Sequence, residues 1–196
     1  MARVYGIKKR LAQQGMDEKL IKEIIGTGNL VDIITRMEDT LDADTVHSML
    51  DSCGCGGGKE YIKQCEKTGK EIAGRTLEAK ITYLNTDTEK LLLNTDGTLT
   101  ATLSYTDNGE YRCLCSAAVK NGVKVSDLAA VSDGRVMPLT YCFCCAGSMR
   151  RHLQLQLSAA LRTKEIISSP INSKGEKPCA FVFEFYDNDL SEEKLL

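Results

Sequence analysis

The sequence predicts an α+β fold, in which an antiparallel sheet of about four strands packs against a helix and follows a helical N-terminal segment. Three observations predict this class. Apolar residues recur at helical spacing through the first seventy residues. Apolar and polar residues then alternate in 98–105 and again in 178–185, which is typical of half-buried strands. Asp107-Asn108-Gly109 indicates a β-hairpin, because Asn-Gly tolerates the positive φ of a tight turn.

The N-terminal segment has the pattern of four short amphipathic helices, which we assign to a helical cap over 1–70. The first three carry apolar faces made of Val4, Ile7 and Leu11; of Leu20, Ile21, Ile24 and Ile25; and of Leu30, Ile33, Ile34 and Met37. Asp42 or Asp44 is suited to cap the fourth, which carries Val46, Met49 and Leu50. Helices this short need a partner surface, so we expect the cap to pack on the rest of the chain.

The α+β domain is predicted over 71–187, and the acidic residues 188–196 form a tail. After a helical pattern that ends at Leu84, four strands are expected, at 98–105, 111–115, 164–169 and 178–185. A loop is expected between the second strand and the next helix. In the last strand Cys179, Phe181, Phe183 and Phe185 share one face, and this face must be buried.

A helix is predicted to follow the cysteine-rich stretch Cys142-Phe143-Cys144-Cys145. Its apolar stripe consists of Met149, Leu153, Leu157 and Leu161, which recur every four residues and are expected to pack on the phenylalanine face. Its polar side includes Arg150 and Arg151. The first turn of a helix carries unpaired backbone N–H groups and the positive end of the dipole, and both favour a thiolate.

Nine cysteines are many for a chain of 196 residues, and their placement is clustered. Cys53 and Cys55 form one C-x-C, Cys113 and Cys115 form a second, and Cys142, Cys144 and Cys145 form a C-x-C-C, whereas Cys65 and Cys179 stand alone. The count is odd, so the cysteines cannot all pair as disulfides. The clusters favour metal binding or thiol chemistry over a disulfide framework.

The metal hypothesis places the site at Cys113, Cys115, Cys142 and Cys144, with Cys145, Cys53 and Cys55 as further candidates. Soft thiolates favour zinc, with an iron–sulfur cluster as the alternative. A C-x-C on a flat strand separates its two residues by about 6.6 Å, whereas two sulfurs on one zinc lie under about 4 Å apart. Chelation therefore requires a kinked backbone, which the ends of elements allow.

The rival hypothesis is a reactive thiol, with Cys144 or Cys145 as the nucleophile of a thiol-dependent hydrolase or redox enzyme. A Cys–His pair would need His47 or His152, the two histidines of the chain. His152 lies seven residues past Cys145, about 10 Å along the same helix, which is too far for direct activation. Both histidines are more often surface or satisfied core residues than catalytic ones.

The C-terminal run 163–185, with Ser168-Ser169-Pro170, Gly175 and Pro178-Cys179-Ala180-Phe181, resembles the closing hairpin of the 4-vinyl reductase domain family. It is also similar to the related bacterial aminothiazoline-carboxylate hydrolase-like family. Over 77–185 the resemblance implies an α+β ligand-binding fold like that of nitric-oxide-sensing and vesicle-tethering domains. Several such domains are sensory modules with cysteine-bound zinc. The family's hairpin cysteine matches Cys179, whereas the C-x-C-C is richer in cysteine than the family pattern.

The overall composition narrows the function classes. A hydrophobic share of 42% and a charged share of 27% are ordinary for a soluble globular protein. A formal net charge of −2 without a basic run argues against nucleic-acid binding, and no apolar run is long enough to span a membrane. The first ten residues lack the apolar core of a secretory signal, so we expect a cytoplasmic protein. We expect a small-molecule ligand, and the sequence leaves a homo-oligomer open.

Overall fold

The computed structural model describes residues 2–26, 30–52, 58–113 and 137–186, with side chains from residue 6 onward. Its helices are α1 (Ala2–Gln13), α2 (Glu18–Ile25), α3 (Leu30–Thr40), α4 (Ala43–Ser52), α5 (Lys59–Glu71), α6 (Leu77–Leu84), the 3₁₀-helix η1 (Leu139–Cys142) and α9 (Phe143–Leu157). Its strands are β1 (Glu89–Leu93), β2 (Leu99–Leu103), β3 (Thr106–Asp107), β4 (Glu110–Tyr111), β5 (Leu161–Ser168) and β6 (Cys179–Phe185). The α+β class predicted from the sequence is confirmed.

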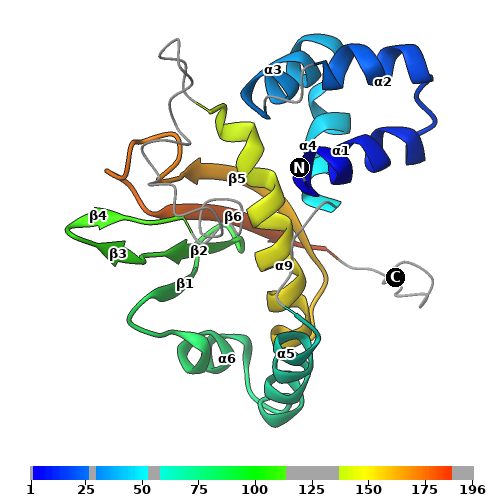
Figure 1. The fold of residues 1–196 in the computed structure, drawn as a ribbon. Helices are drawn as coiled ribbons and strands as arrows, with labels where there is room; N and C mark the ends of the chain where they lie inside the picture. Colours follow the sequence, from blue (N-terminus) through cyan, green and yellow to red (C-terminus); the bar gives the residue numbers. More distant parts are fainter. Residues whose placement is uncertain (1, 27–29, 53–57, 114–136, 187–196) are drawn as a thin grey trace.

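The main sheet has four antiparallel strands in the order β1-β2-β6-β5, and α9 packs against it through β5. Figure 1 shows α9 lying between the sheet and the helices α1–α4, with α5 and α6 at the far end of α9. The N-terminal helices reach the sheet layer through α4, which packs on α9 and η1. The described part of the chain therefore has α9 as its central element.

Two glycines let neighbouring helices approach α9 closely. A Cβ added to Gly147 would overlap the backbone carbonyl of Asp51 in α4, and one added to Gly69 in α5 would overlap the carbonyl of Leu155. Real Cβ atoms do not tolerate such contacts, so both positions need hydrogen in place of a side chain. These two glycines set the distance of α4 and α5 from the central helix.

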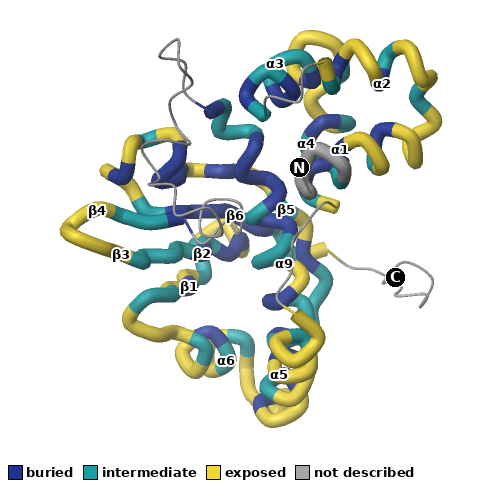
Figure 2. The backbone as a smooth tube through the Cα atoms, viewed as in Figure 1, coloured by how far each residue is buried: buried dark blue, intermediate teal, exposed yellow. Residues whose placement is uncertain are grey.

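The predicted phenylalanine face of the last strand is buried. Phe181 and Phe183 are fully buried with ring centroids 6.3 Å apart, Cys179 is buried, and Phe185 packs at the margin of the core. This core continues through α9 into the N-terminal helices, where Ile24, Ile33 and Met37 are also fully buried. Figure 2 shows the buried backbone running along α9, β5 and β6, whereas the outward sides of α1, α2 and α5 are exposed.

Three details of the sheet differ from the sequence prediction. Leu161 is not the end of the α9 stripe: Ser158 adopts a left-handed φ of 53°, which ends the helix, and Leu161 begins β5. The turn at Asn108-Gly109 is present with positive φ at both residues, but it joins only the short ribbon β3–β4. The long strand β2 pairs instead with β6 and with β1, a strand that the sequence analysis did not predict.

Candidate functional site

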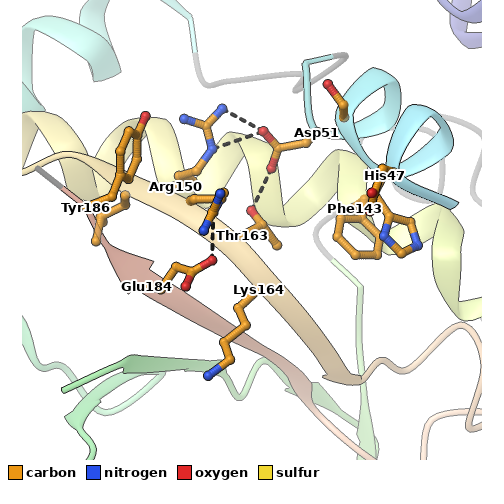
Figure 3. A pocket seen from close by; sticks show the side chains of 12 residues that line it. His47, Asp51, Phe143, Arg150, Thr163, Lys164, Glu184 and Tyr186 are labelled. Carbon is orange, nitrogen blue, oxygen red and sulfur yellow. Dashed lines mark hydrogen bonds and ion pairs between the residues drawn. The ribbon is translucent and has the colours of Figure 1, made fainter. Parts of the chain in front are cut away.

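A pocket of about 630 Å³ lies between α4, the start of α9, the edge strand β5 and the end of β6 (Figure 3). Its volume is in the usual range for sites that bind small molecules. The lining side chains are Asp44, His47, Ser48, Asp51, Phe143, Arg150, Leu161, Arg162, Thr163, Lys164, Glu184 and Tyr186. They come from segments that are far apart in the sequence, so the pocket exists only because α4 folds back onto α9.

One corner of the pocket is built around the carboxylate of Asp51. Arg150 donates to Asp51 Oδ2 from Nε at 3.0 Å and from Nη2 at 2.6 Å, and the Thr163 hydroxyl donates to Oδ1 at 2.6 Å. The remaining guanidinium nitrogen of Arg150, Nη1, donates to Gln154 Oε1 at 2.6 Å. Because the Asp51 and Arg150 side chains are only 16% and 23% exposed, water screens this pair weakly. The network joins α4, α9 and β5.

The part of the pocket wall that lies one helical turn earlier on α4 is aromatic. The imidazole of His47 on α4 stacks on the ring of Phe143, with centroids 3.9 Å apart and planes 12° from parallel. Figure 3 shows the two rings side by side, away from the Asp51–Arg150 corner. Phe143 is buried and packs into the core, whereas His47 is half-buried. The stack therefore ties the middle of α4 to the first residue of α9.

The charges in the pocket wall balance. Three acidic side chains, Asp44, Asp51 and Glu184, face three basic ones, Arg150, Arg162 and Lys164. Arg162 Nε donates to Glu184 Oε1 at 2.6 Å, and Lys164 lies 3.7 Å from the carboxylate of Asp96 outside the pocket. This balance does not favour a ligand with several charges of one sign.

The cysteines that were predicted as a site lie before and after residues 114–136, which are outside the described part of the chain. Cys142 ends η1, Cys144 and Cys145 occupy the first turn of α9, and Cys113 follows β4. Cys113, Cys142 and Cys144 are buried and Cys145 is half-buried. The other predicted ligands, Cys115, Cys53 and Cys55, lie outside the described residues, as does the loop expected after Cys115.

The start of α9 differs from a free helix N-terminus. Because η1 runs directly into α9, the N–H of Phe143 already donates to the carbonyls of Thr140 and Tyr141. Part of the donor set that was expected to favour a thiolate is therefore engaged. Within the four described ranges, no three Cys, His, Asp or Glu side chains are placed to hold a metal ion.

A second polar cluster, which the sequence analysis missed, lies where α5 and α9 meet. The Tyr61 hydroxyl and the Cys65 thiol share a hydrogen bond, and the rings of Tyr61 and His152 form a T-shaped pair with centroids 4.6 Å apart. Burial and the nearby Glu89 carboxylate raise the pKa of Tyr61 to about 12, and burial raises the pKa of the Cys65 thiol. Burial also lowers the pKa of His152. Both shifts favour the neutral forms of Cys65 and His152, unlike the charged forms of a catalytic thiolate–imidazolium pair.

His152 is 8% exposed, and its Nε2 has no hydrogen-bond partner among the described residues.

The sequence did not predict that Asp51, Arg150, Thr163 and His47 would line a common pocket. Arg150 had been assigned to the polar side of its helix, and nothing in the local sequence indicated that Asp51 would meet it. No local periodicity reveals such contacts, since residues about 100 positions apart form them.

Comparison with known proteins adds no identification. No protein-family model, no curated protein and no solved structure matches this chain. In the described ranges, no helix is both long enough and apolar enough to span a membrane.

Proposed function

We propose that this protein is a ligand-binding module whose small-molecule ligand occupies the pocket between α4, α9, β5 and β6. One observation carries the proposal: a pocket of about 630 Å³ has a fixed polar corner at Asp51 and a fixed aromatic end at His47 and Phe143. Both ends are held by contacts within the protein, so the walls are organised before a ligand arrives. Such preorganisation lowers the free-energy cost of binding.

The module is also proposed to bind zinc through cysteines, with an iron–sulfur cluster as the alternative. Cys113, Cys115, Cys142 and Cys144 are the proposed ligands, and Cys145, Cys53 and Cys55 are further candidates. The burial of Cys113, Cys142 and Cys144 supports this proposal, because a protected thiolate site has low access to water. Since the described cysteines do not complete a site, the proposed zinc site requires further ligands from Cys115, Cys53 or Cys55.

The enzyme alternative uses Cys144 or Cys145 as the nucleophile of a thiol-dependent hydrolase or redox protein. Cys145 is the more accessible of the two, which favours it for this role. The resemblance of the closing hairpin to the 4-vinyl reductase domain and aminothiazoline-carboxylate hydrolase-like families stays a proposal. So do the cytoplasmic location, a homo-oligomer, and the absence of nucleic-acid and membrane partners.

Thermal denaturation in the presence of a small-molecule library tests the ligand site. A compound at 100 times its Kd stabilises the folded state by about 2.7 kcal/mol, which is a readily measured shift in Tm. Ser48 is exposed and lines the pocket, so Ser48→Trp should fill the pocket and abolish the shift. Glu38→Trp, at an exposed position of α3, is the matched control and should leave the shift unchanged. Equal shifts in both variants would place binding elsewhere.

Metal analysis of protein purified without oxygen tests the zinc proposal. The wild-type protein should contain zinc in a fixed molar ratio. This ratio should fall when Cys142 or Cys144 is replaced by Ser, whereas Cys65→Ser should leave it unchanged. Because each thiolate regains its proton as pH falls, the affinity for zinc should weaken in acid. Metal-free protein with fast alkylation of Cys144 or Cys145 would instead support the enzyme alternative.

A further inference from the structure

Phe143 belongs both to the cysteine-rich stretch and to the wall of the ligand pocket. It is the single residue between Cys142 and Cys144, so its backbone belongs to the cysteine stretch. Its ring lines the ligand pocket and is stacked by His47. Any rearrangement of the peptide units on either side of Phe143 must therefore move a part of the pocket wall.

The packing around Phe143 leaves little room for independent movement. Its side chain is 6% exposed, and the neighbouring Cys142 and Cys144 are 2% and 5% exposed. Close-packed interiors transmit displacements because they hold few voids. The planes of His47 and Phe143 lie within 12° of parallel, so a rotation of one ring without the other would lose their contact area.

The Asp51 corner of the pocket acts as an anchor. Asp51 is held by Arg150 and Thr163, and its backbone lies against Gly147. Phe143 is seven residues before Arg150 on α9, which corresponds to about two helical turns. With α4 fixed to α9 at Asp51, the stack of His47 on Phe143 is a second contact that holds α4 against α9, and it is the one that includes a residue of the cysteine stretch.

We propose that Phe143 is the positioning residue that couples the His47 wall of the pocket to the reactivity of the cysteines at the start of α9. The inference rests on the proposed function, in which this pocket holds the ligand. Loss of the His47 ring frees Phe143, loosens the first turn of α9 and exposes the thiols of Cys144 and Cys145.

The test measures the rate at which iodoacetamide labels each cysteine of the full chain, by mass spectrometry in the presence of EDTA so that bound metal does not protect the thiols. His47→Ala should speed the labelling of Cys144 and Cys145 by about fivefold or more, the usual size of a coupling between sites. His47→Phe keeps a ring on Phe143 and should restore the wild-type rate. Glu38→Ala changes an exposed position of α3 outside the pocket and the stack, so it should leave the rate unchanged.

Cys65 and Cys179 are buried thiols remote from the stack in sequence, and they report global opening. If His47→Ala speeds the labelling of all four cysteines equally, or of none, the result contradicts the proposed coupling. The outcome is separate from that of the ligand screen, because no compound is present. A library that binds at the pocket while His47→Ala leaves labelling unchanged would keep the ligand site and remove the role of Phe143.

Discussion

Asp51 is the residue that connects the most elements around the pocket. Its carboxylate accepts three hydrogen bonds, two from Arg150 and one from Thr163, so α4, α9 and β5 meet at this side chain. Hydrogen bonds to charged groups are stronger than neutral ones, and leaving a partner unsatisfied adds a further cost. The arrangement explains how a short helix such as α4 persists.

Asp51→Ala should therefore lower the free energy of unfolding by at least about 1.5–3 kcal/mol, the usual contribution of a single hydrogen bond to a charged group. Chemical denaturation measures this loss. The control is Arg162→Ala, which removes the ion pair with Glu184 at a position that is 68% exposed, and it should cost less than about 1 kcal/mol. Equal losses in the two variants would contradict the account of the Asp51 corner.

His152 gives stability a dependence on pH. Burial lowers its pKa in the folded protein, whereas in the unfolded chain the imidazole has its usual pKa of about 6.5. Above that pH both states are neutral and His152 contributes no pH dependence. As pH falls below about 6.5 the unfolded chain takes up the proton first, so stability decreases.

His152→Phe should remove this dependence, because phenylalanine has a similar shape and no proton to bind. The difference in unfolding free energy between wild type and variant should grow between about pH 7 and pH 5 in favour of the variant. Denaturation curves across this range measure the difference. A constant difference across the range would show that His152 titrates normally when folded.

At the scale of elements, local patterns predicted two central elements correctly. The last strand, expected at 178–185, is β6, and the helix after the cysteines is α9. Of the two residues suited to cap α4, Asp42 and Asp44, it is Asp42 whose side chain accepts from the N–H of Thr45, at 2.8 Å. β1 was missed because three consecutive leucines follow Glu89-Lys90 and show neither helical nor strand periodicity.

The pairing of strands was less predictable than their positions. Asn108-Gly109 correctly predicts a turn, but the turn alone does not determine how far the two strands continue to pair. β2 pairs with β6 because Leu99 and Ala101 then meet Phe183 and Phe181 in the core. The same limit applies to the site: the cysteine clusters are visible in the sequence, whereas the pocket depends on where α4 packs.

Gly147→Ala tests the close approach of α4 and α9. The added methyl group would overlap the Asp51 carbonyl, so one helix must move, and overpacking of this kind costs about 1–3 kcal/mol. Gly6→Ala is the matched control, because Gly6 lies in α1 with open space around it and alanine favours a helix by about 1 kcal/mol. Thermal denaturation should show Tm falling in the first variant and rising in the second. A rise in both would contradict the packing of α4.

For the whole molecule, the continuous core is the main source of stability. Phe183 is fully buried at its centre, so Phe183→Ala should lower the free energy of unfolding by about 3–5 kcal/mol. Exposed Leu92 on the edge strand β1 is 63% accessible, and Leu92→Ala should cost far less. Reversible denaturation of the full chain compares the two. A loss below about 1 kcal/mol for Phe183→Ala would contradict the burial of this face.

The central claim is that a small molecule binds between α4 and the edge of the sheet, and the chain offers two histidines that report on it. His47 lines the pocket, and His152 lies at the contact of α5 and α9. The most direct measurement is an NMR titration of histidine-labelled protein with the compounds that raise its Tm. The account predicts that these compounds shift the His47 ring resonances and leave those of His152 unchanged. Shifts at His152 alone, or no shift at either ring, would contradict it.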